Sequence, residues 1–323
     1  MKKRIVVLGT GGTISGRSIS ANDNLGYKAG EVGVESLLRA IRAELRPTFQ
    51  IDCEQLAQLD SKDMSFTVLR ALAQRVETLL ASAEVVGIVI THGTDTLEES
   101  AFFLQQACNP LKPVVLTCAM RPATSFFPDG PQNLLDAFEV ASCVDAAGVF
   151  VVCAGRIHYA HLVQKTHTYR LDSFSSGESG CCGLVEEGRV RFFSVSPTSY
   201  PKSNLGAIKK IKFPVDESAW PYVEILMNFV GARGLVVDAL MAKGVEGIVV
   251  AGTGNGTIHQ SLEIALHRAQ LKGIVVVAAT RCLEGRVLPI AGRQFEGSDG
   301  LSPAKARIAL ILRLLDRGRH PLL

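Results

Sequence analysis

The sequence predicts an α/β protein in which a larger N-terminal domain, with a doubly wound parallel sheet, precedes a smaller C-terminal α/β domain. Apolar runs of strand length, rich in β-branched residues, alternate with segments whose apolar residues recur at helical spacing. This alternation is typical of a parallel sheet with helices on both faces. The chain has 323 residues, more than a single hydrophobic core usually serves, so we expect two domains.

Six apolar runs are the predicted strands, at residues 4–8, 85–91, 113–118, 148–153, 247–251 and 273–279. After the second run, Leu97, Ala101, Leu104 and Ala107 recur at helical spacing, which predicts a helix directly behind that strand. The intervening residues, 92–95, therefore lie at the carboxyl end of a strand and near a helix N-terminus. Ligands bind at this position in open α/β sheets.

The alternation stops between residues 194 and 220, where three prolines interrupt a stretch with little periodicity. We interpret 194–220 as a linker, with the N-terminal domain at 1–193 and the C-terminal domain at 221–323. A helix is predicted at the end of the second domain, because Ser302 is a good N-cap residue and Pro303 suits the first helical position.

The composition describes an ordinary folded protein, because 47% of the residues are hydrophobic and 20% are charged. Lysine and arginine number 34 against 31 for aspartate and glutamate, and the basic residues are scattered. We therefore expect neither nucleic acid nor a membrane as a partner, and no apolar stretch reaches the roughly 20 residues of a membrane span. The eight cysteines include no Cys-x-x-Cys pair, so we expect reduced thiols and no metal site.

Two of the apolar runs end in loops of small and hydroxyl residues. The first loop is Gly-Thr-Gly-Gly-Thr-Ile-Ser at 9–15, and the second is Thr-His-Gly-Thr-Asp-Thr at 91–96. Together they place Thr13 and Thr94 at two strand ends. An enzyme needs such an arrangement to attack a carbonyl group and to stabilise the charge that develops on it.

A nucleotide-binding loop is the competing interpretation of the glycine-rich segments. A Gly-x-Gly-x-x-Gly motif that starts at Gly9 requires glycine at position 14, where the chain has Ile14. The second cluster, 252–257, ends in Thr257 in place of the third glycine, and neither cluster has the Lys-Ser/Thr ending of a P-loop. A nucleotide-dependent dehydrogenase is therefore disfavoured, and the lack of a Gly-x-Ser-x-Gly elbow disfavours a serine hydrolase.

A threonine hydroxyl is a weak nucleophile at neutral pH, so a catalytic Thr13 needs a neighbouring base or polarising hydroxyl. Tyr27 is a candidate, because its segment, 20–33, is rich in Gly, Asn and Asp and could close over a site. Asp95 offers a carboxylate that could bind an ammonium group or orient a lysine, and Lys165 is a candidate for that lysine. The residues by themselves leave open a plain loop position for Tyr27 and a surface position for Lys165.

The two threonine loops together resemble the two signatures of bacterial-type L-asparaginases, in the asparaginase/glutaminase family. The likeness rests on Thr-Gly-Gly-Thr-Ile at 10–14 and Ile-Thr-His-Gly-Thr-Asp-Thr at 90–96. It extends over nearly the whole chain, through segments 26–35, 60–64, 119–122, 129–131, 165–166 and 302–307. The resemblance implies hydrolysis of the side-chain amide of L-asparagine to L-aspartate and ammonia through a threonine acyl-enzyme, without a metal or cofactor.

The resemblance also implies catalytic roles for the matched residues. Thr13 would be the attacking hydroxyl, assisted by Tyr27. Thr94, Asp95 and Lys165 would form a second catalytic group that handles the water. Backbone amides near the two threonines would hold the oxyanion.

Substrate binding is implied for residues beside the second threonine. Ser61 and Asp95, together with Thr94, would bind the α-carboxylate and the α-amino group of an amino acid, which needs donors and an acidic group near the nucleophile. Lys62 stands where secreted relatives often have glutamine. Its charge would pair with the substrate carboxylate or alter the tolerance for glutamine.

The family's architecture implies a homotetramer of two close dimers, with each site completed across a subunit interface. Thr257 occupies the position from which relatives supply a polar residue to the neighbouring subunit, and Glu284 is the candidate for the accompanying acidic residue. We expect a cytoplasmic protein, because glycines interrupt the apolar run after the basic N-terminus and no cleavage site follows. A removed signal peptide would make it periplasmic instead.

The substrate preference stays open at this point. The leading hypothesis is an asparaginase, and the close alternative is a dual glutaminase-asparaginase, since one methylene separates the two substrates by only about 1–3 kcal/mol. From a different class, the chain could be a non-catalytic amino-acid binder or the amidase part of a larger amidotransferase. The intact set Thr13, Tyr27, Thr94, Asp95 and Lys165 counts against a binder.

Overall fold

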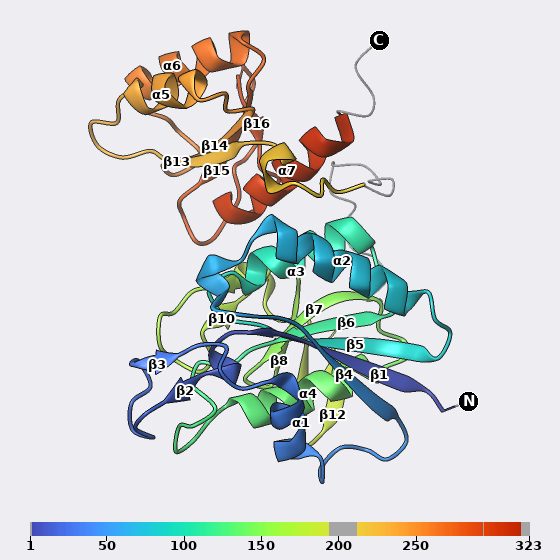
Figure 1. The fold of residues 1–323 in the computed structure, drawn as a ribbon. Helices are drawn as coiled ribbons and strands as arrows, with labels where there is room; N and C mark the ends of the chain where they lie inside the picture. The colour runs from blue at the N-terminus through green and yellow to red at the C-terminus, as the bar shows by residue number, and fades with distance from the viewer. Residues whose placement is uncertain (1, 194–211, 293, 318–323) are drawn as a thin grey trace. The chain divides into compact units, whose positions relative to one another are not determined.

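The structure, a computed structural model, describes residues 2–193, 212–292 and 294–317. The chain forms two compact units, Met1–Tyr200 and Pro201–Leu323 (Figure 1). The predicted linker at 194–220 lies outside the described residues as far as residue 211. The domain boundaries at 193 and 221 therefore stay a prediction.

The first unit is built on an eight-stranded sheet with the order β12-β11-β8-β7-β6-β5-β1-β4 (Figure 1). The parallel part of the sheet consists of β4 (Gln50–Leu59), β1 (Arg4–Gly11), β5 (Val85–Thr91), β6 (Pro113–Thr117) and β7 (Gly148–Cys153). An antiparallel extension continues it with β8 (Arg156–Tyr159), β11 (Gly183–Glu186) and β12 (Arg189–Phe192). The predicted strands of this unit all lie in the parallel part.

Helices cover both faces of this sheet, with α1 and α4 on one face and α2 and α3 on the other (Figure 1). They are α1 (Val34–Ile41), α2 (Phe66–Leu80), α3 (Leu97–Cys108) and α4 (Gly130–Ala141). Ser65 caps α2 by accepting a hydrogen bond from the Val68 N–H, and Asn109 ends α3 in the left-handed conformation, with φ 39°. The arrangement confirms the predicted doubly wound α/β fold.

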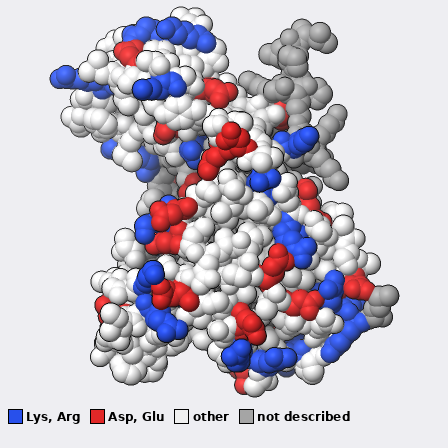
Figure 2. All heavy atoms as spheres, in the orientation of Figure 1, with Lys and Arg blue, Asp and Glu red and all other residues white. Residues whose placement is uncertain are grey.

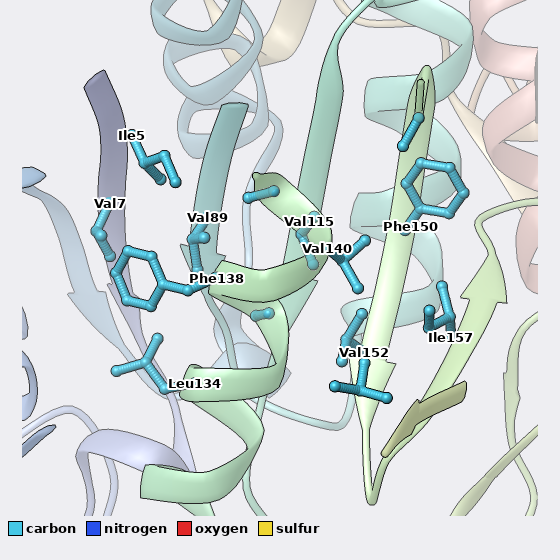
Figure 3. Packing of buried hydrophobic residues seen from close by; sticks show 14 of the residues in the cluster. Ile5, Val7, Val89, Val115, Leu134, Phe138, Val140, Phe150, Val152 and Ile157 are labelled. Atoms are coloured by element: carbon cyan, nitrogen blue, oxygen red, sulfur yellow. The ribbon is translucent and has the colours of Figure 1, made fainter. Parts of the chain in front are cut away.

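One hydrophobic core of the unit lies between α4 and one face of the sheet (Figure 3). Val89, Val115 and Phe150 project from three neighbouring strands with 0% exposure, and Leu134 and Phe138 of α4 point toward the strands (Figure 3). Both faces of these strands are covered, so successive side chains are apolar whichever way they point. This is why the strands are visible in the sequence as continuous apolar runs.

The second unit has a parallel sheet with the order β13-β14-β15-β16. Its elements are β13 (Val223–Met227), α5 (Leu235–Ala242), β14 (Gly247–Gly252), α6 (Gln260–Leu271), β15 (Val275–Thr280), β16 (Glu296–Gly297) and α7 (Pro303–Arg317). Helices α5 and α6 pack against each other, and α7 packs on β13, β14 and β15. Ser302 caps α7 as predicted, because its Oγ accepts a hydrogen bond from the Lys305 N–H at 3.4 Å.

Short elements fill several connections of the first unit. The hairpin of β2 (Arg17–Ser18) and β3 (Tyr27–Lys28) and the pair β9 (Gln164–Lys165) and β10 (Phe174–Ser175) are both antiparallel. Single 3₁₀ turns lie at Thr13–Ser15, Ser61–Asp63, Gly177–Ser179 and Glu217–Ala219, the last in the second unit. These short elements carry most of the candidate site residues.

Two parts of the first sheet have no strand signal in the sequence. β4 is an edge strand whose residues are exposed or half-buried throughout, so it lacks a continuous apolar run. The strands β8, β11 and β12 have four residues each, too few for a period to be recognised. The sheet therefore continues beyond the predicted parallel strands into an antiparallel extension.

Charges of both signs are spread over the surface. Lys and Arg side chains alternate with Asp and Glu on the face shown in Figure 2, and the formal net charge is +3. In the second unit, Arg268 pairs with Asp238 at 2.7 Å and Arg313 with Glu296 at 2.6 Å. Within the described part of the chain, no helix has the length and apolar character to cross a membrane.

We predict that Phe150→Ala lowers the free energy of unfolding by about 3–5 kcal/mol, because it empties a fully enclosed position of the core between α4 and the sheet. Chemical denaturation measures the change. Leu111→Ala is the control, since Leu111 is 88% exposed and its truncation is expected to change stability by less than about 0.5 kcal/mol. Equal effects of the two substitutions would contradict the packing described above.

Candidate active site

The two threonine loops meet at the carboxyl end of the parallel sheet. β1 and β5 are neighbours in the sheet, so the loops that follow them lie side by side. Gly12 has φ 81°, and a Cβ atom on it would collide with the backbone of Gly93. A Cβ atom on Gly93 would in turn collide with the Ser61 hydroxyl. Glycine at both positions therefore allows the two loops and the Ser61 turn to come together.

Thr13 begins the 3₁₀ turn after β1 and is buried, at 6% exposure. Its Oγ1 atom lies 2.6 Å from the hydroxyl oxygen of Tyr27, which β3 carries back over the turn. The Tyr27 ring lies against Gly16, where an added Cβ atom would be 2.8 Å from the ring. The structure thus brings the first pair of candidate residues into hydrogen-bond contact.

Lys165 joins Thr94 and Asp95 in a second cluster. Its Nζ atom donates to Thr94 Oγ1 at 2.7 Å and to Asp95 Oδ1 at 2.6 Å. The backbone N–H of Lys165 donates to Glu98 Oε2 at 2.7 Å, so α3 holds β9 in place. No motif of the sequence singles out Glu98, because a carboxylate in the first turn of a helix has an ordinary role near the helix dipole.

Ser61 lies beside the second loop and is buried, at 2% exposure. Its Oγ accepts a hydrogen bond from the Asp95 N–H at 3.2 Å, and its carbonyl accepts one from Thr96 Oγ1 at 2.7 Å. Because the Ser61 hydroxyl acts as acceptor in this contact, it can donate its own proton to an anion. The predicted binding residues Ser61 and Asp95 are therefore direct neighbours.

Lys62 faces two carboxylates of its own turn. Its Nζ atom is 2.8 Å from Asp60 Oδ2 and 3.9 Å from Asp63 Oδ2, and 64% of its side chain is exposed. Burial opposes the charge of Asp60, but the hydrogen bonds and charge of Lys62 outweigh burial, so the pKa of this carboxyl lies below its ordinary value. The hydrogen bond to Asp60 likewise raises the pKa of Lys62. The pair keeps its opposite charges.

Burial raises the pKa of the Tyr27 phenol above its ordinary value of 10.0. The hydrogen bond with Thr13 and the charge of Lys62 lower this pKa, whereas the carboxylates of Asp60 and Asp95 raise it. The balance is a raised pKa, so Tyr27 carries its proton at neutral pH. A neutral phenol can both accept a hydrogen bond from a threonine hydroxyl and donate its own proton.

His92 stabilises the second loop from inside the fold. The ring is fully buried, and its Nδ1 atom lies 2.7 Å from the Gly93 carbonyl oxygen. Burial lowers the pKa of the imidazole to about 4, so the ring is neutral at physiological pH. The Nδ1 atom therefore carries the proton and donates it to that carbonyl.

Thr257 and Glu284 belong to the second unit and are exposed. The Thr257 hydroxyl donates to the Thr253 carbonyl at 2.8 Å and lies 2.9 Å from the Thr253 hydroxyl, in a small turn. Their place at the site of a neighbouring subunit stays a prediction. Among residues 2–193, 212–292 and 294–317, no group of three His, Cys, Asp or Glu side chains is placed to hold a metal ion.

Family models match both units of the chain. The model described as "Asparaginase, N-terminal" matches residues 4–197, and "Glutaminase/Asparaginase C-terminal domain" matches residues 222–320. The chain belongs to the asparaginase family. The family resemblance of the two threonine loops is thereby confirmed.

Relatives in this family match the chain over most of their length. L-asparaginase 2 of Bacillus subtilis (strain 168) is 38% identical over 320 residues, which cover 96% of this chain and 82% of that protein. L-asparaginase 2 of Escherichia coli (strain K12) is 35% identical, with 96% and 88% covered. Glutaminase-asparaginase of Pseudomonas fluorescens biotype A is 34% identical, with 96% and 86% covered.

A solved asparaginase-family structure shares the fold. The crystal structure of a probable cytoplasmic L-asparaginase from Campylobacter jejuni matches with a TM-score of 0.87 and 36% sequence identity. The match covers 97% of this chain and 95% of that chain. Two units of this kind, a larger N-terminal and a smaller C-terminal one, also correspond to the two family models.

We predict that Tyr27 titrates above 10, because burial disfavours its phenolate. The absorbance of tyrosinate, followed with pH in the native protein and in Tyr27→Phe, isolates this group by difference. Thr13→Val is expected to move the midpoint still higher, since it removes the hydrogen bond that favours the phenolate. A Tyr27 midpoint below 10, or one that falls in Thr13→Val, would contradict the environment described for the ring.

Proposed function

We propose that this chain is an L-asparaginase, which hydrolyses the side-chain amide of L-asparagine to L-aspartate and ammonia. One observation carries the proposal: Thr13 and Thr94 lie on two loops whose backbones touch at the carboxyl end of the sheet, and each has its partners within hydrogen-bond distance, Tyr27 for Thr13 and Lys165 with Asp95 for Thr94. Membership of the asparaginase family and relatives named L-asparaginase support it.

In the first half of the proposed reaction, Thr13 Oγ1 forms a bond with the amide carbon of the substrate. The proton of Thr13 passes to the Tyr27 hydroxyl at 2.6 Å, and the phenol's own proton passes on to the amide nitrogen. The C–N bond then breaks, ammonia leaves, and an ester between Thr13 and the aspartyl group remains. Backbone N–H groups of the two loops stabilise the negative oxygen of the tetrahedral intermediate.

In the second half, a water molecule attacks the ester carbon. The Thr94 hydroxyl orients this water, and Lys165 holds that hydroxyl at 2.7 Å while Asp95 holds Lys165 at 2.6 Å. A bond forms between the water oxygen and the carbonyl carbon, and the bond to Thr13 breaks. One proton of the water returns to Thr13 and the new carboxyl group loses the other to the solvent, so the enzyme is restored and L-aspartate is released.

Substrate recognition follows from the charges around Thr94. Asp95 has 53% of its side chain exposed, so its carboxylate can meet the α-ammonium group of an amino acid. The Ser61 hydroxyl can donate a hydrogen bond to the α-carboxylate of the substrate. The positive charge of the exposed Lys62 side chain also attracts this carboxylate. A dual glutaminase-asparaginase is the second candidate, favoured by the relative of that name in Pseudomonas fluorescens.

We further propose a cytoplasmic homotetramer of two close dimers, in which Thr257 and Glu284 approach the site of a neighbouring subunit. The likeness to a structure described as a probable cytoplasmic L-asparaginase supports the location. A relative from Haemophilus influenzae is named as a probable periplasmic L-asparaginase, so the periplasm is the alternative. Light scattering of the purified protein tests the tetramer directly.

The function is tested by ammonia release from L-asparagine and from L-glutamine, measured side by side. We expect release from L-asparagine, and a loss of at least about 10³-fold in kcat for Thr13→Ala, because that change removes the nucleophile. Circular dichroism is expected to be unchanged, since the substitution deletes one hydroxyl and one methyl group from a turn. Comparable release from both substrates would favour the dual enzyme, and near-normal activity of Thr13→Ala would exclude Thr13 as the nucleophile.

We predict that Lys62→Gln raises KM for L-asparagine about two- to fivefold and leaves kcat unchanged, the size expected for one exposed ion pair. The difference from the native enzyme is expected to shrink at high ionic strength. Lys3→Gln is the matched control, because Lys3 is an exposed lysine that precedes β1, at the end of the strand opposite the site. A KM of Lys62→Gln equal to that of the control would remove Lys62 from substrate binding.

A further inference from the structure

The hairpin that carries Tyr27 rests on a loop that has no part in the proposed chemistry. The loop follows β6 and runs from Pro122 to Phe127. Two backbone N–H groups of the loop donate to carbonyl groups of the hairpin region, Ala123 to Gly16 at 3.0 Å and Phe126 to Ala21 at 3.1 Å. The Ser125 hydroxyl donates to Asn24 Oδ1 at 2.8 Å. Thr124 makes two further hydrogen bonds with Ser18.

Thr124 holds the hairpin at the residue opposite Tyr27. Its Oγ1 atom accepts a hydrogen bond from the Ser18 N–H at 2.8 Å and donates to the Ser18 carbonyl at 3.4 Å. Ser18 is buried and pairs with Tyr27 in the antiparallel register of β2 and β3. The Thr124 hydroxyl therefore satisfies both the N–H and the carbonyl group of Ser18, the residue of β2 that pairs with Tyr27.

The loop that bears Thr124 is itself anchored to the core. The Asp129 carboxylate accepts hydrogen bonds from the N–H groups of Met120 at 2.9 Å and Arg121 at 3.0 Å. Asn133 of α4 donates to the same carboxylate at 3.2 Å and to the Cys118 carbonyl at 3.0 Å. Thr124 thus belongs to a segment fixed at the end of β6 and at the start of α4.

A hairpin with two residues in each strand has no stability of its own in water, so contacts outside the hairpin must determine its position. The position matters because Tyr27 has to lie within hydrogen-bond distance of Thr13 to relay a proton. A displacement of about 1 Å is enough to break such an arrangement and lower a rate substantially. The contact between Thr124 and Ser18 therefore helps to determine the distance between Tyr27 and Thr13, because Ser18 pairs with Tyr27.

We propose that Thr124 is a positioning residue for the reaction: its hydroxyl latches β2 to the loop after β6 and thereby holds the Tyr27 hydroxyl against Thr13. The inference rests on the proposed function, in which Tyr27 relays the proton of Thr13. In the proposed reaction, Thr124 contacts neither the substrate nor Thr13. Its effect passes through the Ser18–Tyr27 pair alone.

The test compares Thr124→Val, which keeps the shape and removes the hydroxyl, with Thr124→Ser, which keeps the hydroxyl. We expect kcat for L-asparagine to fall about tenfold in Thr124→Val, the factor that corresponds to one lost hydrogen bond at a buried group. Thr124→Ser is expected to stay within about twofold of the native enzyme. Phe127→Ala, at a position with 78% exposure on the same loop, is the control and is expected to leave kcat unchanged.

A double-mutant cycle with Tyr27→Phe separates positioning from a general structural effect. If Thr124 acts through Tyr27, the valine substitution lowers kcat by less than about twofold when the phenol is already absent. An undiminished tenfold loss in the Tyr27→Phe background would overturn the proposal. So would an equal loss in Thr124→Ser and Thr124→Val.

Hydrogen exchange of the amides in residues 17–28 tests the latch without reference to activity. We expect faster exchange of this segment in Thr124→Val than in the native protein and in Thr124→Ser, with the strands β5 and β6 unaffected. Native exchange together with native kcat in Thr124→Val would refute the latch. Failure of the native protein to release ammonia would refute the proposed function instead, and the exchange comparison would then decide the latch by itself.

Discussion

The candidate site depends on the contact between the backbones of Gly12 and Gly93. A side chain at either position would push the two loops apart, because the space is already filled by backbone or by the Ser61 hydroxyl. Thr13 follows one glycine and Thr94 the other, so the contact sets how near the two hydroxyl groups can be. Segments far apart in the sequence thereby share one small volume at the carboxyl end of the sheet, where α/β folds bind ligands.

The two halves of the site are held in different ways. Thr94 and its partner Lys165 are tied to regular elements, since β5 leads into the loop and Glu98 of α3 holds the Lys165 backbone. Tyr27 lies on a minimal hairpin that depends on hydrogen bonds to another loop. The Thr94 half is therefore fixed by the sheet and α3, whereas the position of the Tyr27 half depends on contacts between loops. This difference suits the proposed reaction, which must admit substrate and then exclude water.

Charges at the site are balanced in close pairs. Lys165 meets Asp95 at 2.6 Å and Lys62 meets Asp60 at 2.8 Å, so the site has both signs available for an amino acid with an ammonium and a carboxylate group. Burial and the two carboxylates raise the pKa of Tyr27. The phenol is consequently neutral, which the proposed proton relay through Tyr27 requires.

The sequence by itself determined the central parallel strands and the two threonine loops, because a strand covered on both faces must be apolar throughout and a tight loop at its end needs glycine. It also carried the family likeness that the comparisons confirmed. Only the tertiary structure decided the edge strand β4, the antiparallel extension, and the contacts of Glu98 and Thr124. A partly exposed edge strand has no continuous apolar pattern, and a hydrogen bond between distant segments depends on strand order and loop path, which local residue types do not specify.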